Sequence, residues 1–225
     1  MRYAHDAFGP LPDRIGLKAR EVVYLSLKRR ILLNDLKPLT PLTELGVAQE
    51  IGCSQGTVRE ALLLLQEDGL VLRDGHRGTS VTPLDVEVAE EMLALRRQIE
   101  TRAAKRSAGK INAATLEQLT VYQAEMDRTA AAGDEFGLIE NDVRFHMSLF
   151  QAAGFQALEQ ILKRVILHTH RQKLWEPRHR RPLAETAGRH RSILAAIPAG
   201  GDALAAALGQ HIDTIVDVAP DRMAS

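Results

Sequence analysis

The stretch from Thr43 to Gly69, TELGVAQEIGCSQGTVREALLLLQEDG, decides how the first part of this 225-residue chain folds. Apolar residues lie on one face of a short helix that ends at Ile51, and a second apolar face runs from Val58 to Leu65 at helical spacing. Gly52 favours a left-handed turn between these helices, because glycine adopts positive φ without steric cost. Two short helices joined by such a turn predict a helix-turn-helix.

The flanking residues complete a domain. Residues 70–81 alternate apolar and polar side chains around Asp74-Gly75, which predicts a β-hairpin wing. Residues 17–33 have helical spacing and predict a first helix that closes a three-helix core. Thr82-Pro83 ends the domain, because proline cannot donate to a continuing strand and the apolar period changes. We therefore predict a winged helix-turn-helix over residues 17–83, preceded by a mobile arm over residues 1–16.

The start of the second helix and the wing are the predicted DNA-reading parts. An α-helix fits the major groove of B-DNA, and an arginine can grip guanine or a phosphate with two hydrogen bonds. The residues expected to contact DNA are Ser54, Gln55, Thr57, Arg59, His76, Arg77 and Gly78. The alternative for Arg59 alone is a solvated helix arginine. Net charge gives little support, because residues 1–83 carry 11 basic and 10 acidic side chains.

The run from Tyr24 to Val81, with SQGTVREALLLLQEDGLV and HRGTSV, resembles the winged helix of GntR-type bacterial transcription regulators. The resemblance implies a homodimer that binds double-stranded DNA at an inverted-repeat operator. That family usually has arginines where this chain has Leu45 and Gln55, so a changed operator or weaker binding is implied. Gln55 can still hydrogen-bond adenine, whereas Leu45 cannot hold a phosphate.

From residue 84 onward the sequence predicts an all-α bundle of about six helices. The expected helices cover about 85–108, 113–132, 134–153, a fourth segment ending near 175, 183–197 and 202–218, the last capped by Asp202. In the first of them Met92, Leu95, Ile99 and Ala103 are expected to face inward. The fold class is therefore mainly α, with a small β wing in the first domain and a helical effector-binding and dimerisation domain over residues 84–225.

One set of polar residues in the bundle points to metal chemistry. Asp142 and His146 are four residues apart and so project from the same helix face. His190 and His211 each lie among apolar neighbours, which suggests that they face inward toward the same space. Three imidazoles and a carboxylate suit a divalent ion such as zinc or nickel. The alternative is that these are core histidines, one of them oriented by an aspartate.

From Met92 to Ile215 the chain is similar to the FCD effector domain of the FadR-like branch of the GntR family. The similarity rests on LRRQIE, DVRFH, RHRSILAAI and GDALAAALGQHI. In metal-binding members an aspartate and three histidines at these places are the ligands, which implies that the ligands here are Asp142, His146, His190 and His211.

The same resemblance implies residues for an effector. Arg96 matches a family arginine and is expected to bind an effector carboxylate, with a salt bridge to Glu100 as the alternative. Arg171 is a second, weaker candidate. The remaining bundle histidines do not match the ligand places and are expected at the surface or at the rim of a pocket: His168, His170 and His179.

The composition excludes some classes of protein. Cys53 is the only cysteine, so no disulfide forms within the chain, and no apolar run approaches the roughly 20 residues of a membrane span. We predict a cytoplasmic transcription repressor without a membrane partner, whose operator affinity responds to a small carboxylate metabolite bound at the metal site. A metal-sensing regulator is one alternative. A metal-dependent hydrolase is another, although no HExxH motif supports it.

Overall fold

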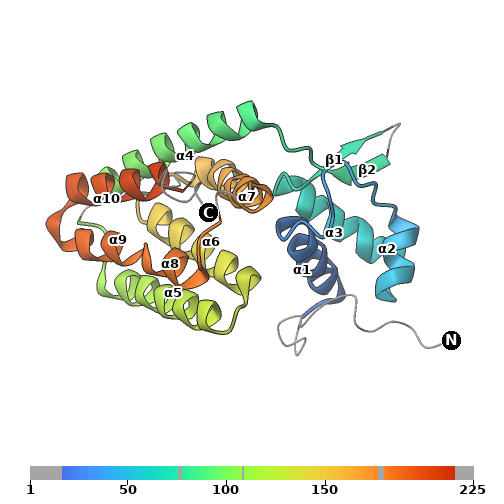
Figure 1. Ribbon diagram of the computed structural model, residues 1–225, viewed down its shortest axis with the longest axis horizontal. Helices are drawn as coiled ribbons and strands as arrows, with labels where there is room; N and C mark the ends of the chain where they lie inside the picture. The colour runs from blue at the N-terminus through green and yellow to red at the C-terminus, as the bar shows by residue number, and fades with distance from the viewer. Residues whose placement is uncertain (1–16, 76–77, 108, 177–179, 216–225) are drawn as a thin grey trace, which may run out of the picture. The chain divides into compact units, whose positions relative to one another are not determined.

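The computed structural model describes residues 17–75, 78–107, 109–176 and 180–215 (Figure 1). The chain divides into two compact units between Pro83 and Leu84. The described residues are mainly helical, with one two-stranded antiparallel sheet, which confirms the predicted fold class. The arm predicted over residues 1–16 lies outside the described residues.

In the first unit α1 (Ala19–Leu32), α2 (Glu44–Ile51) and α3 (Gln55–Glu67) enclose a small core. Apolar side chains of α1 and α3 are fully or almost fully buried there: Val23, Leu27, Ile31, Val58, Leu62 and Leu65. Both helices of the helix-turn-helix have hydroxyl caps, since Thr43 Oγ1 accepts from the amide of Gly46 at 3.1 Å and Ser54 Oγ accepts from that of Thr57 at 3.1 Å. These caps fix where α2 and α3 begin.

The turn and the wing follow the sequence pattern. Gly52 has φ 79°, the left-handed conformation that ends α2. Strands β1 (Val71–Asp74) and β2 (Gly78–Val81) pair antiparallel, with Val71 opposite Val81. The predicted hairpin is therefore present, and the tip residues 76 and 77 lie outside the described residues.

The second unit is built from helices that surround a second core. They are α4 (Val86–Ser107), α5 (Ala113–Ala131), α6 (Glu135–Gln151), α7 (Glu159–Trp175), α8 (Leu183–Gly188), α9 (Arg191–Ala196) and α10 (Gly201–Asp213), with 3-10 turns η1 (Gln156–Leu158) and η3 (Ile197–Ala199). Helix α10 packs along α4, α5 along α6, and α7 against α4 (Figure 1). Phe145, Leu149 and Ile193 are buried at the centre of this core.

Two details of the helical unit differ from the sequence expectation. The fifth predicted helix is divided into α8 and α9, and His190 is the residue before α9. The amide and Nδ1 of His190 both lie near the carbonyl of Ala187, at 3.4 and 3.3 Å, so a turn interrupts the helix there. Helix α10 begins at Gly201, and Asp202 makes no cap hydrogen bond.

The predicted inner face of α4 is correct for Ala103, which is buried, and incomplete for Met92 and Ile99, which are half-buried, but it is wrong for Leu95. Leu95 is 39% exposed, whereas Arg96 and Glu100 are buried. The two charged residues occupy the inner face because they neutralise each other there, with Arg96 Nε 2.6 Å from Glu100 Oε1. Within the described residues, no helix has the length and apolar character that crossing a membrane requires.

Candidate functional site

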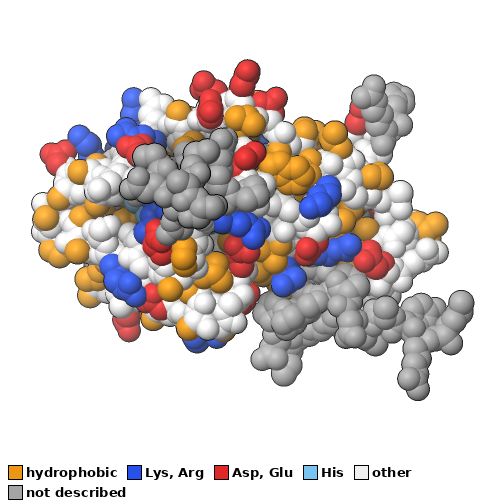
Figure 2. Space-filling view, in the orientation of Figure 1, with side chains coloured by type: hydrophobic (Ala, Val, Ile, Leu, Met, Phe, Trp, Pro, Cys, Tyr) orange, Lys and Arg blue, Asp and Glu red, His pale blue; other side chains and the backbone are white. Residues whose placement is uncertain are grey.

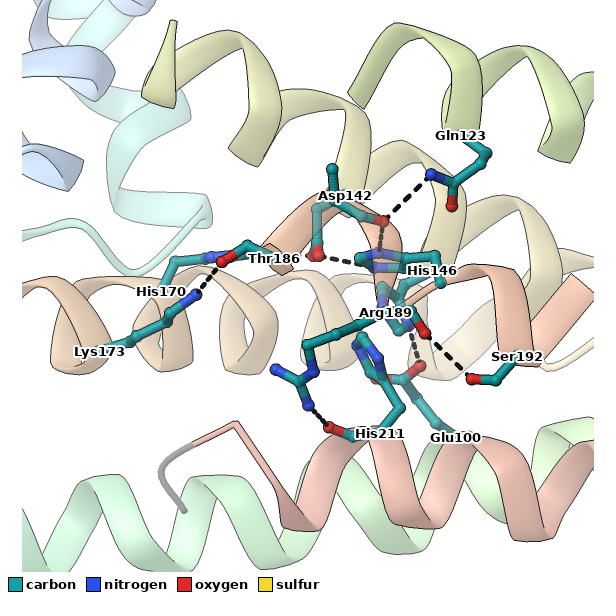
Figure 3. Close-up of polar contacts among 12 residues, drawn as sticks. Glu100, Gln123, Asp142, His146, His170, Lys173, Thr186, Arg189, Ser192 and His211 are labelled. Carbon is teal, nitrogen blue, oxygen red and sulfur yellow. Dashed lines mark hydrogen bonds and ion pairs between the residues drawn. The ribbon is translucent and has the colours of Figure 1, made fainter. Parts of the chain in front are cut away.

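The four predicted metal ligands lie together inside the helical unit. Asp142 and His146 come from α6, His190 from the turn before α9 and His211 from α10. One donor atom from each lies within 4.8 Å of the others. All four residues are buried, and the face drawn in Figure 2 shows almost no histidine at its surface. Three separate chain segments therefore place one carboxylate and three imidazoles in one small volume (Figure 3).

Several donor atoms of this cluster have no partner within the described part of the chain. His146 Nε2, His190 Nε2 and His211 Nδ1 are buried without a hydrogen bond. His190 Nε2 also lies 2.9 Å from the carboxylate oxygen Oδ1 of Asp142. A buried polar atom without a partner is costly, so each one needs an explanation. A divalent ion held by Asp142 and the three imidazoles would satisfy these nitrogens, and this donor set suits zinc or nickel.

Glu100 fixes the orientation of one imidazole. His146 Nδ1 lies 2.5 Å from Glu100 Oε2, and Arg96 holds the other carboxylate oxygen. Burial opposes ionisation of Glu100, but the nearby charges of His146 and Arg96 outweigh it and lower its pKa to about 2. Because Glu100 is ionised, it accepts from Nδ1 of His146, so in the neutral imidazole that a metal requires Nε2 is the ligand atom. A carboxylate behind a ligand histidine is a common feature of metal sites.

His170 supports the aspartate in a similar way. Its Nε2 lies 2.8 Å from Asp142 Oδ2. His168 and His170 were expected at the surface or at the rim of a pocket; both are buried, at 7% exposed, and His170 lines two cavities. A sequence signal existed for His170, which lies three residues after Leu167 and four before Leu174 on the apolar face of α7. His179 lies outside the described residues.

The protonation states favour metal binding at neutral pH. Burial lowers the pKa of His190 and of His211, so both imidazoles are neutral. Burial opposes ionisation of Asp142 as well, but the charges of His170 and His146 hold its pKa well below the usual range. A carboxylate and neutral imidazoles are the forms that coordinate a metal, so no proton has to leave these three groups first.

A small cavity adjoins the cluster. It is lined by Arg96, Asp142, Thr169, His170, Lys173, Thr186, Arg189, His190, His211 and Ile215. Arg96 forms the salt bridge to Glu100 that the sequence offered as the alternative, and it also lines this cavity, so an effector contact of Arg96 stays a prediction. Arg171 is fully buried but is not among the residues that line this cavity.

Lys173 is a lining residue that the sequence did not reveal. Its Nζ donates to Thr186 Oγ1 at 3.3 Å (Figure 3), and burial lowers its pKa to about 8. Lys173 and Thr186, together with His170, also line a neighbouring cavity that includes Arg180, Arg181 and the carboxylate of Glu135. Cationic side chains therefore gather beside the cluster, where the sequence alone indicated only arginines 96 and 171.

The predicted DNA-reading residues lie on exposed parts of the first unit. Gln55 is exposed at the start of α3, and Ser54 and Thr57 form its cap. Gly78 opens β2 with φ 82°. His76 and Arg77 lie outside the described residues.

Arg59 is exposed but not simply solvated. Its Nη2 lies 2.7 Å from Glu44 Oε2 and its Nε 2.9 Å from Glu44 Oε1, a two-point ion pair that joins α3 to α2. Arg73 on β1 approaches the same carboxylate at 3.7 Å. The pKa of Glu44 is lowered, chiefly by the hydrogen bond from Arg59. Glu44 thus organises two arginines on one surface of this unit.

Two family models match the chain. Residues 19–81 match the bacterial regulatory proteins of the gntR family, and residues 91–214, more than half of the chain, match the FCD domain. Over 196 residues the chain is 28% identical to the HTH-type transcriptional repressor RspR of Escherichia coli, which covers 86% of this chain and 85% of that protein. It is 29% identical over 146 residues to YdhC of Bacillus subtilis, an uncharacterized HTH-type transcriptional regulator. That alignment covers 63% of this chain and 64% of YdhC, less than two thirds of that protein.

Solved structures share the fold. Escherichia coli McbR/YncC has a TM-score of 0.71 at 18% identity, over 88% of this chain and 94% of that chain. A GntR-type putative transcriptional regulator from Rhodococcus sp. RHA1 has a TM-score of 0.62 at 23% identity, over 88% of this chain and 93% of that chain. At such identities these likenesses establish the arrangement of helices and strands and no ligand.

Proposed function

Because the chain belongs to the GntR family of bacterial regulators and carries an FCD domain, we propose that it is a repressor whose operator affinity responds to a small acidic metabolite bound at a metal centre. Its relatives are HTH-type transcriptional regulators, so it is a transcription regulator and not an enzyme, and a hydrolase is no longer a candidate. The name of RspR supports repression as the sign of regulation.

The main support for a metal centre is the group of three buried imidazole nitrogens that have no hydrogen bonds and lie beside the Asp142 carboxylate. Asp142, His146, His190 and His211 would hold the ion. When bound, a divalent ion supplies positive charge that a carboxylate ligand can coordinate. Nη2 of Arg96 is buried without a hydrogen bond in the described part of the chain, and Arg96 lines the same cavity, so it is the proposed second contact for that carboxylate. Arg171 is not part of this proposal.

The metabolite would act by favouring one conformation. The cavity draws its lining from α4, α6, α7, α10 and the α8–α9 turn, so a ligand that bridges these elements stabilises one packing of the helical unit. Only a ligand that prefers one state can shift an equilibrium between two states. In a homodimer, such a shift would change how well two winged helices fit an inverted-repeat operator. We place this regulation in the cytoplasm.

On the DNA side, we propose that Ser54, Gln55, Thr57, Arg59 and the wing residues His76, Arg77 and Gly78 contact the operator. Gln55 is exposed one turn before Arg59 on α3, which suits two contacts in one major groove. Arg59 would exchange its Glu44 partner for a base or a phosphate.

Selection of binding sites from a random pool of double-stranded DNA tests this function. The purified protein, Arg59→Ala and Arg128→Ala would be compared at two salt concentrations. Arg128 is a matched control, because it is also exposed and paired with a glutamate, Glu125, at 2.8 Å, but lies in the helical unit. We expect the protein and Arg128→Ala to enrich an inverted repeat, and Arg59→Ala to bind it about 10-fold or more weakly. Absence of any enriched repeat would contradict the proposal.

The proposed response to an acidic metabolite is tested by titrating the selected DNA with the protein. Acetate, succinate and citrate would be added to zinc-loaded and to chelator-treated protein. We expect at least one acid to lower DNA affinity only when zinc is present. If zinc alone changes DNA affinity and no acid does so, the ion itself is the effector and the protein is a metal sensor.

A further inference from the structure

Lys173 is a buried cation without an anionic partner in the described part of the chain. The residue is 8% exposed on α7, and its hydrogen bond is a long one to the Thr186 hydroxyl. No carboxylate of the described residues lies within ion-pair distance of its Nζ. A buried ammonium is costly unless an opposite charge accompanies it, so its presence in a cavity points to an anion that comes from outside the chain.

Arg189 provides a second cation in the same cavity. It lies between α8 and α9, is only half-buried, and donates through Nη2 to the backbone oxygen of His211 and to Thr214 Oγ1. Neither acceptor is a carboxylate. The third cation of the cavity, Arg96, differs from both, because Glu100 already neutralises it.

The charges that line the cavity exceed what one carboxylate can neutralise. Asp142 is the one carboxylate among the described lining residues, and it is held by His170 and belongs to the metal-ligand cluster. A divalent ion bound there would leave the cluster positive even after Asp142 is counted. Lys173 and Arg189 then add positive charge on the same cavity wall.

We propose that the ligand of this cavity is a compact acid with two anionic groups, one directed to the Asp142 cluster and the other held by Lys173 and Arg189. This inference rests on the proposed function and specifies its effector class. The acid must be short, because Lys173 and Arg189 line the same small cavity as the metal-ligand residues. Thr186 positions the ammonium and leaves its other protons for the ligand.

Isothermal titration calorimetry on the zinc-loaded full chain, at constant ionic strength, tests the proposal by measuring the affinity for each acid. Butyrate and succinate form the first pair of probes, since they have the same number of carbons and differ in the second carboxylate. Phosphoglycolate is the third probe and shows whether a phosphate replaces that carboxylate well. The variants are Lys173→Met and, as control, Lys105→Met, which removes an exposed lysine of α4 that already pairs with Asp202 at 2.9 Å.

We expect succinate or phosphoglycolate to bind at least about 10-fold more tightly than butyrate, the effect of hydrogen bonds to a charged group. Lys173→Met should remove most of this preference and leave butyrate affinity within about two-fold, which also shows that the variant is folded. Lys105→Met should bind all three acids as the parent protein does. Whichever of succinate and phosphoglycolate binds more tightly identifies the second anionic group as a carboxylate or a phosphate.

If zinc-dependent binding of butyrate is as tight as that of succinate and of phosphoglycolate, the effector needs only one charged group. This inference is then wrong, while the proposed function still stands. The inference is also wrong if Lys173→Met weakens the binding of butyrate, succinate and phosphoglycolate equally. If no acid binds the zinc-loaded protein, both this inference and the acid-responsive part of the proposed function are wrong.

Discussion

Glu44 in the winged helix and Glu100 in the helical unit both hold an arginine, but they do so in opposite surroundings. The Glu44 and Arg59 side chains are 21% and 59% exposed, whereas those of Arg96 and Glu100 are 1% and 2% exposed. An exposed pair adds little stability and can exchange its partner for water or a phosphate. A buried pair cannot do this at low cost, so it serves to hold a fixed arrangement, here the imidazole of His146.

The same contrast applies to the polar atoms around each pair. On the winged helix, the glutamate that accepts from Arg59 is also approached by Arg73. In the helical unit three imidazole nitrogens remain without hydrogen bonds. A surface can leave such atoms to water, but a core cannot, and this difference is why the buried cluster points to a resident ligand while the surface cluster points to an exchangeable one.

Metal removal should produce the largest difference in thermal stability between the helical unit and the winged helix. An ion present at about 1,000 times its Kd stabilises the folded state by about 4 kcal/mol, and chelation should therefore lower the Tm of the helical unit by about 10 °C. The measurement is thermal unfolding followed by circular dichroism, with and without a chelator. His146→Ala is the control, since its Tm should respond little to chelation. An unchanged Tm after the metal content has fallen would contradict a stabilising ion.

Glu100→Gln tests whether the buried pair orients the metal ligand. Loss of the negative charge behind His146 should weaken zinc binding by about 10-fold to 100-fold, the usual effect of losing a carboxylate behind a ligand histidine. Competition with a zinc-binding dye measures this change. Glu91→Gln on the exposed side of α4 is the control and should bind zinc normally. Equal zinc affinity in both variants would mean that Glu100 serves packing only.

Acidification should weaken the metal-free helical unit before it affects the winged helix. Above pH 6.5 His190 and His211 are neutral in both the folded and the unfolded chain and contribute no pH dependence. As the pH falls below 6.5, the unfolded chain takes up protons that the folded core, with its lowered pKa values, does not. The free energy of unfolding should thus fall by about 1 to 2 kcal/mol per pH unit.

Urea unfolding of chelator-treated protein at pH 7.5, 6.5 and 5.5 checks the acid effect. The lowered pKa of Glu44 contributes its full stability above the unfolded value of about 4.5 and loses it only as the pH falls below that value, so the winged helix should lose little over this range. Equal loss of stability in both units would show that the buried imidazoles are not the cause.

The smallest expected change comes from Glu44→Gln. Because the Glu44–Arg59 pair is exposed, its loss should move the Tm by no more than about 2 °C. Release of Arg59 and Arg73 should increase the affinity for non-specific DNA by a few-fold and steepen its dependence on salt. Fluorescence anisotropy with a labelled duplex measures both effects. A much larger decrease in Tm would show that the Glu44–Arg59 pair stabilises the fold.

Local signals made much of the fold predictable. The positive φ of Gly52 ends α2 as the sequence predicted, and the hydroxyls of Thr43 and Ser54 cap the two helices on either side of this turn. The pair Asp142 and His146 could be recognised because i, i+4 spacing on one helix needs no knowledge of other segments. The inward direction of His190 and His211 was inferred from their apolar neighbours.

Contacts between distant segments were not predictable. Glu100 contacts His146, which is 46 residues away in the sequence, and His170 contacts Asp142, which is 28 residues away. Each looked like an ordinary polar residue because its partner lies on another helix. The same reason explains why Leu95 was wrongly expected to face inward. The inner face of α4 holds the charged pair Arg96 and Glu100, and a prediction from apolar periodicity places charged residues on the solvent side.

The most direct measurement of the central claim is the metal content of the purified chain. Protein prepared without a metal-binding tag or added metal would be analysed by inductively coupled plasma mass spectrometry beside His190→Ala and His168→Gln. We predict one divalent ion per chain in the parent protein and in His168→Gln, and a large loss in His190→Ala. A chain that carries no ion and takes up none from micromolar zinc or nickel, or equal metal in His190→Ala, would contradict the account.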